Sequence, residues 1–130
     1  VGLHCHGGYM FGGSPDVIEH IISLGKGRIG LNIDTAWCMQ IGPSHGQPIA
    51  WVDRFKDHLF GVHYKDFTFN PNGSWNDVIV GTGNLNLPAF IKALEEAKFD
   101  GIAVIEYEGD VENPLPALKN CVTKMRNLST

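Results

Sequence analysis

Four short apolar runs in this chain each end in a pair of polar residues two positions apart. Side chains alternate along a strand, so the two members of a pair would share one face. The pairs are His4 and His6, Asn32 and Asp34, His63 and Lys65, and Glu106 and Glu108. Imidazole and carboxylate groups bind divalent cations, and a carboxylate beside a cation can move a proton at carbon. The pattern predicts a site for Mn²⁺, Mg²⁺, Fe²⁺, Co²⁺ or Zn²⁺.

Each of these residues also has a simpler structural explanation. A single aspartate at a strand end often caps the following loop, and a single histidine in a strand can be purely structural. Lys65 could equally pair with Asp66 or with Glu108. A shared polar site is favoured because four consecutive runs end in ionisable groups at alternate positions, so that each run can turn these groups to the same face of the sheet. Ligands bind at the carboxyl ends of the strands in α/β folds.

Four predicted strands, each followed by a predicted helix, would position these residues. Apolar runs predict strands at residues 1–6, 28–34, 59–64 and 101–107. Apolar residues three and four apart predict helices at 16–24, 49–58, 89–98 and 115–128. This order predicts an α/β fold with parallel strands, either an open sheet or half of an eight-stranded barrel. The segments 39–47 and 66–83 are expected to be loops, the second with a turn at Pro71-Asn72-Gly73.

Composition narrows the function classes. The chain of 130 residues is long enough for one domain, and its net charge of −4 with only ten Lys and Arg argues against nucleic-acid binding. The sequence has no apolar run long enough for a membrane span, so no membrane partner is expected. Three cysteines, none in CxxC spacing, indicate reduced thiols and a cytoplasmic protein. Gly81-Thr82-Gly83 is only a weak indication of a nucleotide site, because no strand leads directly into it.

Several motifs occur in an order that resembles a known family. They are His4-Cys5-His6, Asp34-Thr35-Ala36-Trp37, His63-Tyr64-Lys65-Asp66, Gly81-Thr82-Gly83 and Val104-Ile105-Glu106. Together they resemble the C-terminal half of the xylose isomerase-like TIM barrel superfamily, the sugar phosphate isomerases and epimerases. The resemblance spans nearly the whole chain. It implies that residues 1–130 form strands five to eight of such a barrel.

The resemblance also implies a set of site residues. Asp34, His63 and Glu106 would hold a divalent metal ion, and Glu106 would also move a proton next to the carbonyl of a sugar. His4, His6, Trp37 and Lys65 would bind that sugar, and Trp37 stands where many relatives carry histidine. The expected reaction is isomerisation or epimerisation. A lyase that dehydrates keto-sugars or inososes on the same site is the alternative.

The family's first metal ligand, a glutamate, lies on a strand that precedes the H-x-H strand and is absent from this sequence. Half a barrel leaves strand edges and an inner face uncovered. We therefore expect self-association as a homo-oligomer, or association with a missing N-terminal half. An inactive half-barrel fragment is a further alternative. The abasic-site endonuclease branch of the superfamily is disfavoured, because it needs a basic groove.

Overall fold

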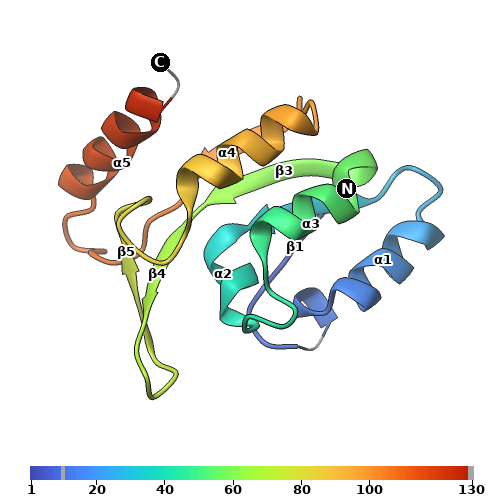
Figure 1. The fold of residues 1–130 in the computed structure, drawn as a ribbon, viewed down its shortest axis with the longest axis horizontal. Helices are drawn as coiled ribbons and strands as arrows, with labels where there is room; N and C mark the ends of the chain where they lie inside the picture. The colour runs from blue at the N-terminus through green and yellow to red at the C-terminus, as the bar shows by residue number, and fades with distance from the viewer. Residues whose placement is uncertain (10, 129–130) are drawn as a thin grey trace.

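Four parallel strands form the centre of the protein (Figure 1). The computed structural model describes residues 1–9 and 11–128. The strand order is β1-β2-β3-β6, and the bounds are Gly2–His4, Gly30–Asp34, Leu59–Tyr64 and Ile102–Ile105. Each of these four strands lies inside a predicted apolar run, and β3 has the predicted bounds. The predicted α/β fold with parallel strands is confirmed.

Some of the helices begin after a residue whose side chain caps the first turn. Their bounds are α1 Pro15–Leu24, α2 Thr35–Gln40, α3 Pro48–Phe55, α4 Leu87–Glu96 and α5 Leu115–Leu128. The Ser14 hydroxyl accepts a hydrogen bond from the first turn of α1, and the Asn86 carboxamide does so for α4. Residues Lys56–His58, predicted as the end of a helix, form a 3₁₀ turn. None of the described helices is both long and apolar enough to cross a membrane.

Helices cover one face of the sheet and leave the other open. Apolar residues of α1, α3 and α4 pack with Leu31, Ile33 and Val62, whose side chains are fully buried. Phe90 of α4 is also buried, with its ring edge-on to Tyr64 at a centroid distance of 5.9 Å. This packed layer accounts for most of the apolar burial, the main favourable term in folding.

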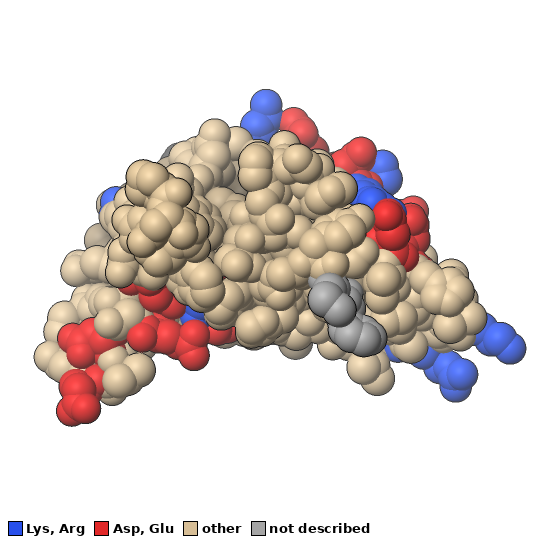
Figure 2. Space-filling view, turned by 90° about the horizontal axis from the view of Figure 1, so that it is seen from below, with Lys and Arg blue, Asp and Glu red and all other residues tan. Residues whose placement is uncertain are grey.

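The opposite face of the sheet is hollow. Asn32 and His63 help to line a cavity of about 270 Å³ there, and Ile102 and Val104 at its edge are 74% and 44% exposed. A side chain on Gly61 would meet the Asn32 carboxamide and displace it, so the glycine leaves room for Asn32 on this face. In Figure 2 the molecule has the outline of an arch with a hollowed lower side, and acidic side chains gather at one end. The open face has the curvature of half a barrel.

The segment 66–83, expected to be a loop, contains an antiparallel hairpin. Its strands are β4 Asp66–Phe69 and β5 Trp75–Val78, and they project beyond the carboxyl end of β3 (Figure 1). The predicted turn at Pro71-Asn72-Gly73 connects them, with Gly73 at a φ of +84°. The hairpin therefore stands at the edge of the sheet where the polar pairs end.

Candidate metal centre

Four ionisable side chains from four strands meet at the carboxyl edge of the sheet. They are His4, Asp34, His63 and Glu106, and one ligand atom from each lies within 4.8 Å of the others. Strand register explains the meeting, because Asp34 pairs with His63 on the neighbouring strand and Glu106 donates its backbone N–H to Tyr64. Alternation then turns these side chains to the open face. We call these four residues the His/Asp/Glu cluster.

His4 lies inside this cluster, although the sequence placed it among the substrate-binding residues. Its Nε2 is 3.3 Å from Nδ1 of His63 and 3.6 Å from Oδ2 of Asp34. The nearby Asp34 carboxylate raises the pKa of His4 above its ordinary value, against the opposing effect of burial. The fourth member of the His/Asp/Glu cluster is thus a residue of β1.

Asp34 is oriented by the helix that follows it. Its Oδ1 accepts a hydrogen bond of 2.9 Å from the backbone N–H of Trp37, which makes Asp34 the N-cap of α2. The side chain is fully buried, and Oδ2 has no hydrogen-bond partner among the described residues. A buried carboxylate oxygen without a partner is costly. A cation at the centre of the cluster would satisfy it.

A buried lysine holds Glu106 from the other side. Oε2 of Glu106 lies 2.6 Å from Nδ1 of His63, and Oε1 accepts a hydrogen bond of 2.9 Å from Nζ of Lys65. The same Nζ reaches Glu108 at 2.6 Å and Asp77 at 3.0 Å. Burial raises the pKa of Glu106, but the hydrogen bonds from Lys65 and His63 outweigh it and leave that pKa below its ordinary value. Glu106 is therefore held ionised.

The donor set fits a divalent cation. Two imidazole nitrogens and two carboxylates suit Mn²⁺, Fe²⁺, Co²⁺ or Zn²⁺, and such a site accepts several of them. The unpartnered Oδ2 of Asp34 is the observation that favours this use. Of the four cluster residues, Glu106 is the one whose side chain is bonded to the Lys65 ammonium group in the described part of the chain.

The two other predicted sugar-binding residues, His6 and Trp37, lie beside the cluster and not in it. Their rings stack with a centroid distance of 4.2 Å and an interplanar angle of 21°. Trp37 also meets the edges of Phe67 and Trp75 of the hairpin, at 5.1 and 5.5 Å. Sequence reasoning missed Phe67, Trp75 and Asp77, because it treated the hairpin as a loop. The alternation of residues 66–69 was a signal that could have identified it.

The Gly81-Thr82-Gly83 segment binds a carboxylate of the protein itself. Oδ2 of Asp66 accepts hydrogen bonds from the backbone N–H groups of Gly81 and Gly83, and Oδ1 accepts one from Leu85, at 2.8 to 3.0 Å. Asp66 is fully buried, and Gly81 has a φ of +78°. These amides are thus occupied, and the segment offers no phosphate cradle. Asp66 pairs with this loop and not with Lys65.

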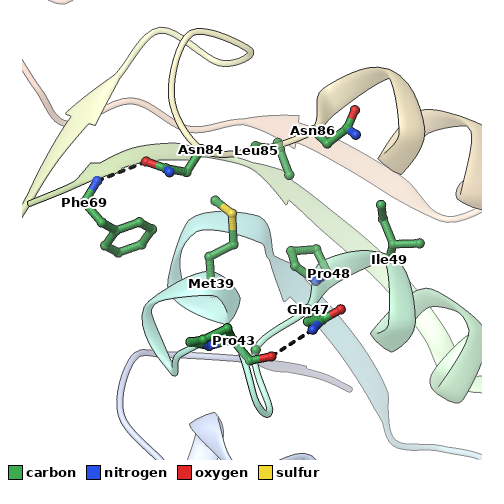
Figure 3. A pocket seen from close by; sticks show the side chains of 10 residues that line it. Met39, Pro43, Gln47, Pro48, Ile49, Phe69, Asn84, Leu85 and Asn86 are labelled. Carbon is green, nitrogen blue, oxygen red and sulfur yellow. Dashed lines mark hydrogen bonds between the residues drawn. The ribbon is translucent and has the colours of Figure 1, made fainter. Parts of the chain in front are cut away.

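A separate pocket lies between α2, α3 and the start of α4 (Figure 3). Its volume is about 360 Å³, and Met39, Phe69 and Leu85 contribute much of its apolar lining. Its polar side chains are carboxamides, and none of its lining residues is ionisable. The Gln47 carboxamide is bonded to the Pro43 carbonyl. The pocket therefore lacks the groups needed to bind a metal ion or to move a proton.

Comparison with solved structures identifies the fold. A xylose isomerase domain protein from Planctomyces limnophilus is 21% identical with a TM-score of 0.64, over 85% of this chain and 41% of that one. The 3-keto-D-glucoside 4-epimerase of E. coli is 18% identical with a TM-score of 0.73, over 98% and 45%. Mannonate dehydratase from Streptococcus suis is 13% identical with a TM-score of 0.74, over 98% and 41%. This chain spans less than half the length of each.

No curated protein matches the sequence. The family described as xylose isomerase-like TIM barrel matches residues 1–127. The four parallel strands, their helices and their curvature agree with part of such a barrel in the solved structures. The match covers nearly the whole chain, as the motifs of the sequence indicated, and the chain belongs to the xylose isomerase-like TIM barrel family.

Proposed function

We propose that this chain supplies the metal-binding part of a sugar isomerase or epimerase that works by proton transfer next to a carbonyl. The observation that carries the proposal is the His/Asp/Glu cluster with the unpartnered, buried Oδ2 of Asp34. Two of the similar structures are named as an epimerase and an epimerase-like protein, which supports sugar as the substrate class.

Each residue has a distinct part in this proposal. A divalent cation held by His4, Asp34, His63 and Glu106 would polarise the sugar's carbonyl oxygen. The ionised Glu106 would take the proton from the carbon next to the carbonyl and, in an isomerisation, deliver it to the former carbonyl carbon; an epimerisation would need a second acid on the opposite face of the sugar. Lys65 keeps Glu106 ionised and fixes its orientation through the 2.9 Å bond.

Sugar binding is assigned to side chains around the cluster. His6 and Trp37 present stacked rings beside it, and the C–H face of a sugar packs well on such a surface. The three cysteines are free and buried, which fits the reducing cytoplasm that we propose as the location.

The barrel must be completed for this chemistry, because water would otherwise fill the open face. We propose that residues 1–130 supply strands five to eight and that four further strands close the barrel, from a second copy or from an N-terminal half. The exposed Ile102 and Val104 support closure along β6. Light scattering at micromolar concentration tests the second-copy form, and a monodisperse monomer would exclude it.

Metal binding is the first test. Calorimetry with Mn²⁺ and Co²⁺ is expected to give one site per chain, and Asp34→Ala is expected to weaken the affinity by at least about 100-fold, because it removes a direct ligand. Asp53→Ala is the matched control, since that carboxylate is 84% exposed and, among the residues that the structure describes, pairs with Lys56 alone. An Asp34→Ala variant with unchanged affinity would refute the ligand assignment.

The reaction is tested by isotope exchange. A panel of keto-sugars in D₂O with Mn²⁺ is expected to gain deuterium at the carbon next to the carbonyl, and Glu106→Gln is expected to abolish the exchange. Folded, metal-loaded protein without exchange on any keto-sugar would favour the inactive half-barrel.

A dehydratase is the second candidate, because a mannonate dehydratase is among the similar structures and elimination begins with the same proton abstraction. Loss of water from the product, seen by mass spectrometry, distinguishes the two reactions. An abasic-site endonuclease is disfavoured because binding DNA needs a basic groove, and the chain has only ten Lys and Arg residues and a net charge of −4.

A further inference from the structure

The β4–β5 hairpin carries four chemically active or aromatic side chains on one face. Antiparallel pairing sets Phe67 opposite Asp77 and Phe69 opposite Trp75, and directly paired residues share a face. The hairpin follows β3 at the carboxyl edge of the sheet (Figure 1). This face is therefore a continuation of the wall beside the His/Asp/Glu cluster.

Two contacts attach this face to the cluster. Oδ2 of Asp77 lies 3.0 Å from Nζ of Lys65, the same nitrogen that binds Glu106. The Trp75 indole meets the edge of Trp37 at 5.5 Å and 76°, and the backbone N–H of Trp37 binds Asp34. Trp37 is thus the one residue between Trp75 and the proposed metal ligand Asp34 in this series of contacts.

The Trp75 side chain is partly exposed to solvent on this face of the hairpin. Phe67 stacks on one side of its indole at 5.8 Å and 23° and is itself only 1% exposed. Trp75 remains 39% exposed, so much of the indole is left in contact with solvent. A rigid, half-covered indole beside a polar centre is the usual surface for stacking a ring with apolar C–H faces.

A group that can bind hydroxyls lies near this surface. The Glu108 side chain is 63% exposed and uses Oε2 to bind Lys65. Its backbone N–H is also fixed, through a bond of 3.3 Å to Asp77. An indole for the ring face and a fixed carboxylate for the hydroxyls match a second sugar ring better than a purely apolar group.

We propose that Trp75, with Glu108, forms a subsite for a second sugar ring, so that the substrate is a disaccharide-like glycoside and not a free monosaccharide. This inference rests on the proposed sugar chemistry at the cluster and specifies its substrate class. The ring that reacts lies at the cluster, and the linked ring stacks on Trp75.

Binding measurements on the intact protein test the subsite. The probes are D-glucose and the disaccharides maltose, cellobiose and trehalose, each titrated by calorimetry with Mn²⁺ present. At least one disaccharide is expected to bind roughly tenfold more tightly than D-glucose, as burying a further ring face would give. Trp75→Ala is expected to remove that difference, with a smaller effect on D-glucose than on the disaccharide because Trp75 also packs against Trp37, whereas Trp75→Phe retains most of the difference.

Asn76→Ala is the matched control, because Asn76 is an exposed neighbour whose side chain points to the opposite face of the hairpin. It is expected to leave every affinity as in the wild type. Circular dichroism checks that each variant is folded. Equal affinity for D-glucose and all three disaccharides, or a preference that survives in Trp75→Ala, would overturn the subsite.

The outcomes separate this inference from the proposed function. If Mn²⁺ fails to bind, the metal chemistry is wrong, but the comparison of disaccharides with D-glucose can still be made without metal. If Mn²⁺ binds and keto-sugars exchange deuterium while Trp75→Ala changes nothing, the proposed function stands and the subsite is wrong.

Discussion

Replacing Asp66 by alanine is expected to destabilise the protein strongly, although Asp66 lies outside the His/Asp/Glu cluster. Its carboxylate accepts three backbone hydrogen bonds, from Gly81, Gly83 and Leu85, and is fully buried. Hydrogen bonds to a charged group contribute about 1.5–3 kcal/mol each. Burial raises the pKa of Asp66 despite these bonds, so part of their energy offsets the desolvation of the carboxylate.

The net loss expected for Asp66→Ala is therefore about 3 kcal/mol, well below the sum of three bonds. Urea unfolding followed by circular dichroism measures it. With a slope of about 2 kcal/mol per molar urea, the midpoint would fall by roughly 1.5 M without a change in slope. Amide hydrogen exchange at Gly81, Gly83 and Leu85 should become faster in the variant, because their acceptor is gone.

Two comparison variants make the result specific. Asp66→Asn keeps the shape and one oxygen acceptor, so its cost should fall between those of the wild type and Asp66→Ala. Asp57→Ala removes an exposed carboxylate and is expected to change stability by less than about 0.5 kcal/mol. An Asp66→Ala variant within about 1 kcal/mol of the wild type would refute the idea that this carboxylate holds the loop together.

Three further predictions concern the helical layer and the surface. Phe90→Ala should lower the unfolding free energy by about 4 kcal/mol in urea titrations, and Phe60→Ala by clearly less, because Phe90 is fully buried and Phe60 is 37% exposed. Burial raises the pKa of the Cys5 thiol to about 12, so a thiol reagent at pH 8 should modify Cys5 only after unfolding; rapid labelling of the native protein would contradict this. The Arg54 guanidinium, 2.7 Å from Asp16, lowers the pKa of that carboxyl group, so any stabilisation by the pair is present above the usual pKa of about 3.9 and lost as pH falls through the lowered value. An NMR titration should show the Asp16 pKa rising in Arg54→Gln, and no rise would exclude Arg54 as the cause.

Strand periodicity was enough to predict which side chains meet at the edge of the sheet. Asp34, His63 and Glu106 end apolar runs and share one face of the sheet, and parallel strands bring such ends together. The position of His4 follows from the same rule, since His4 pairs with Asn32 and extends toward Asp34. Strand alternation thus predicted His4 at this rim, whereas the family resemblance assigned it to sugar binding because a strand before β1 was expected to supply the remaining ligand.

Two elements were not predicted, for different physical reasons. Helix α2 has only six residues, and Thr35, Trp37 and Cys38 are weak helix formers, so no periodicity could reveal it. It forms because Asp34 caps its first turn and tertiary contacts bury Thr35, Ala36 and Cys38. The hairpin was not predicted because Pro71-Asn72-Gly73 indicates a turn but does not show that the residues on either side of it pair as strands.

Residues that could not touch a cation determine the geometry of the His/Asp/Glu cluster. Asp66 holds the loop after the hairpin, the hairpin presents Asp77 to Lys65, and Lys65 fixes Glu106. Partners that orient a metal ligand typically change metal affinity by about 10- to 100-fold when they are removed. Folded Asp66→Ala protein should therefore bind Mn²⁺ more weakly than the wild type, although Asp66 is two positions beyond the end of β3. Unchanged affinity in calorimetry would mean that Lys65 keeps its place without the hairpin, held by Glu106 and Glu108 alone.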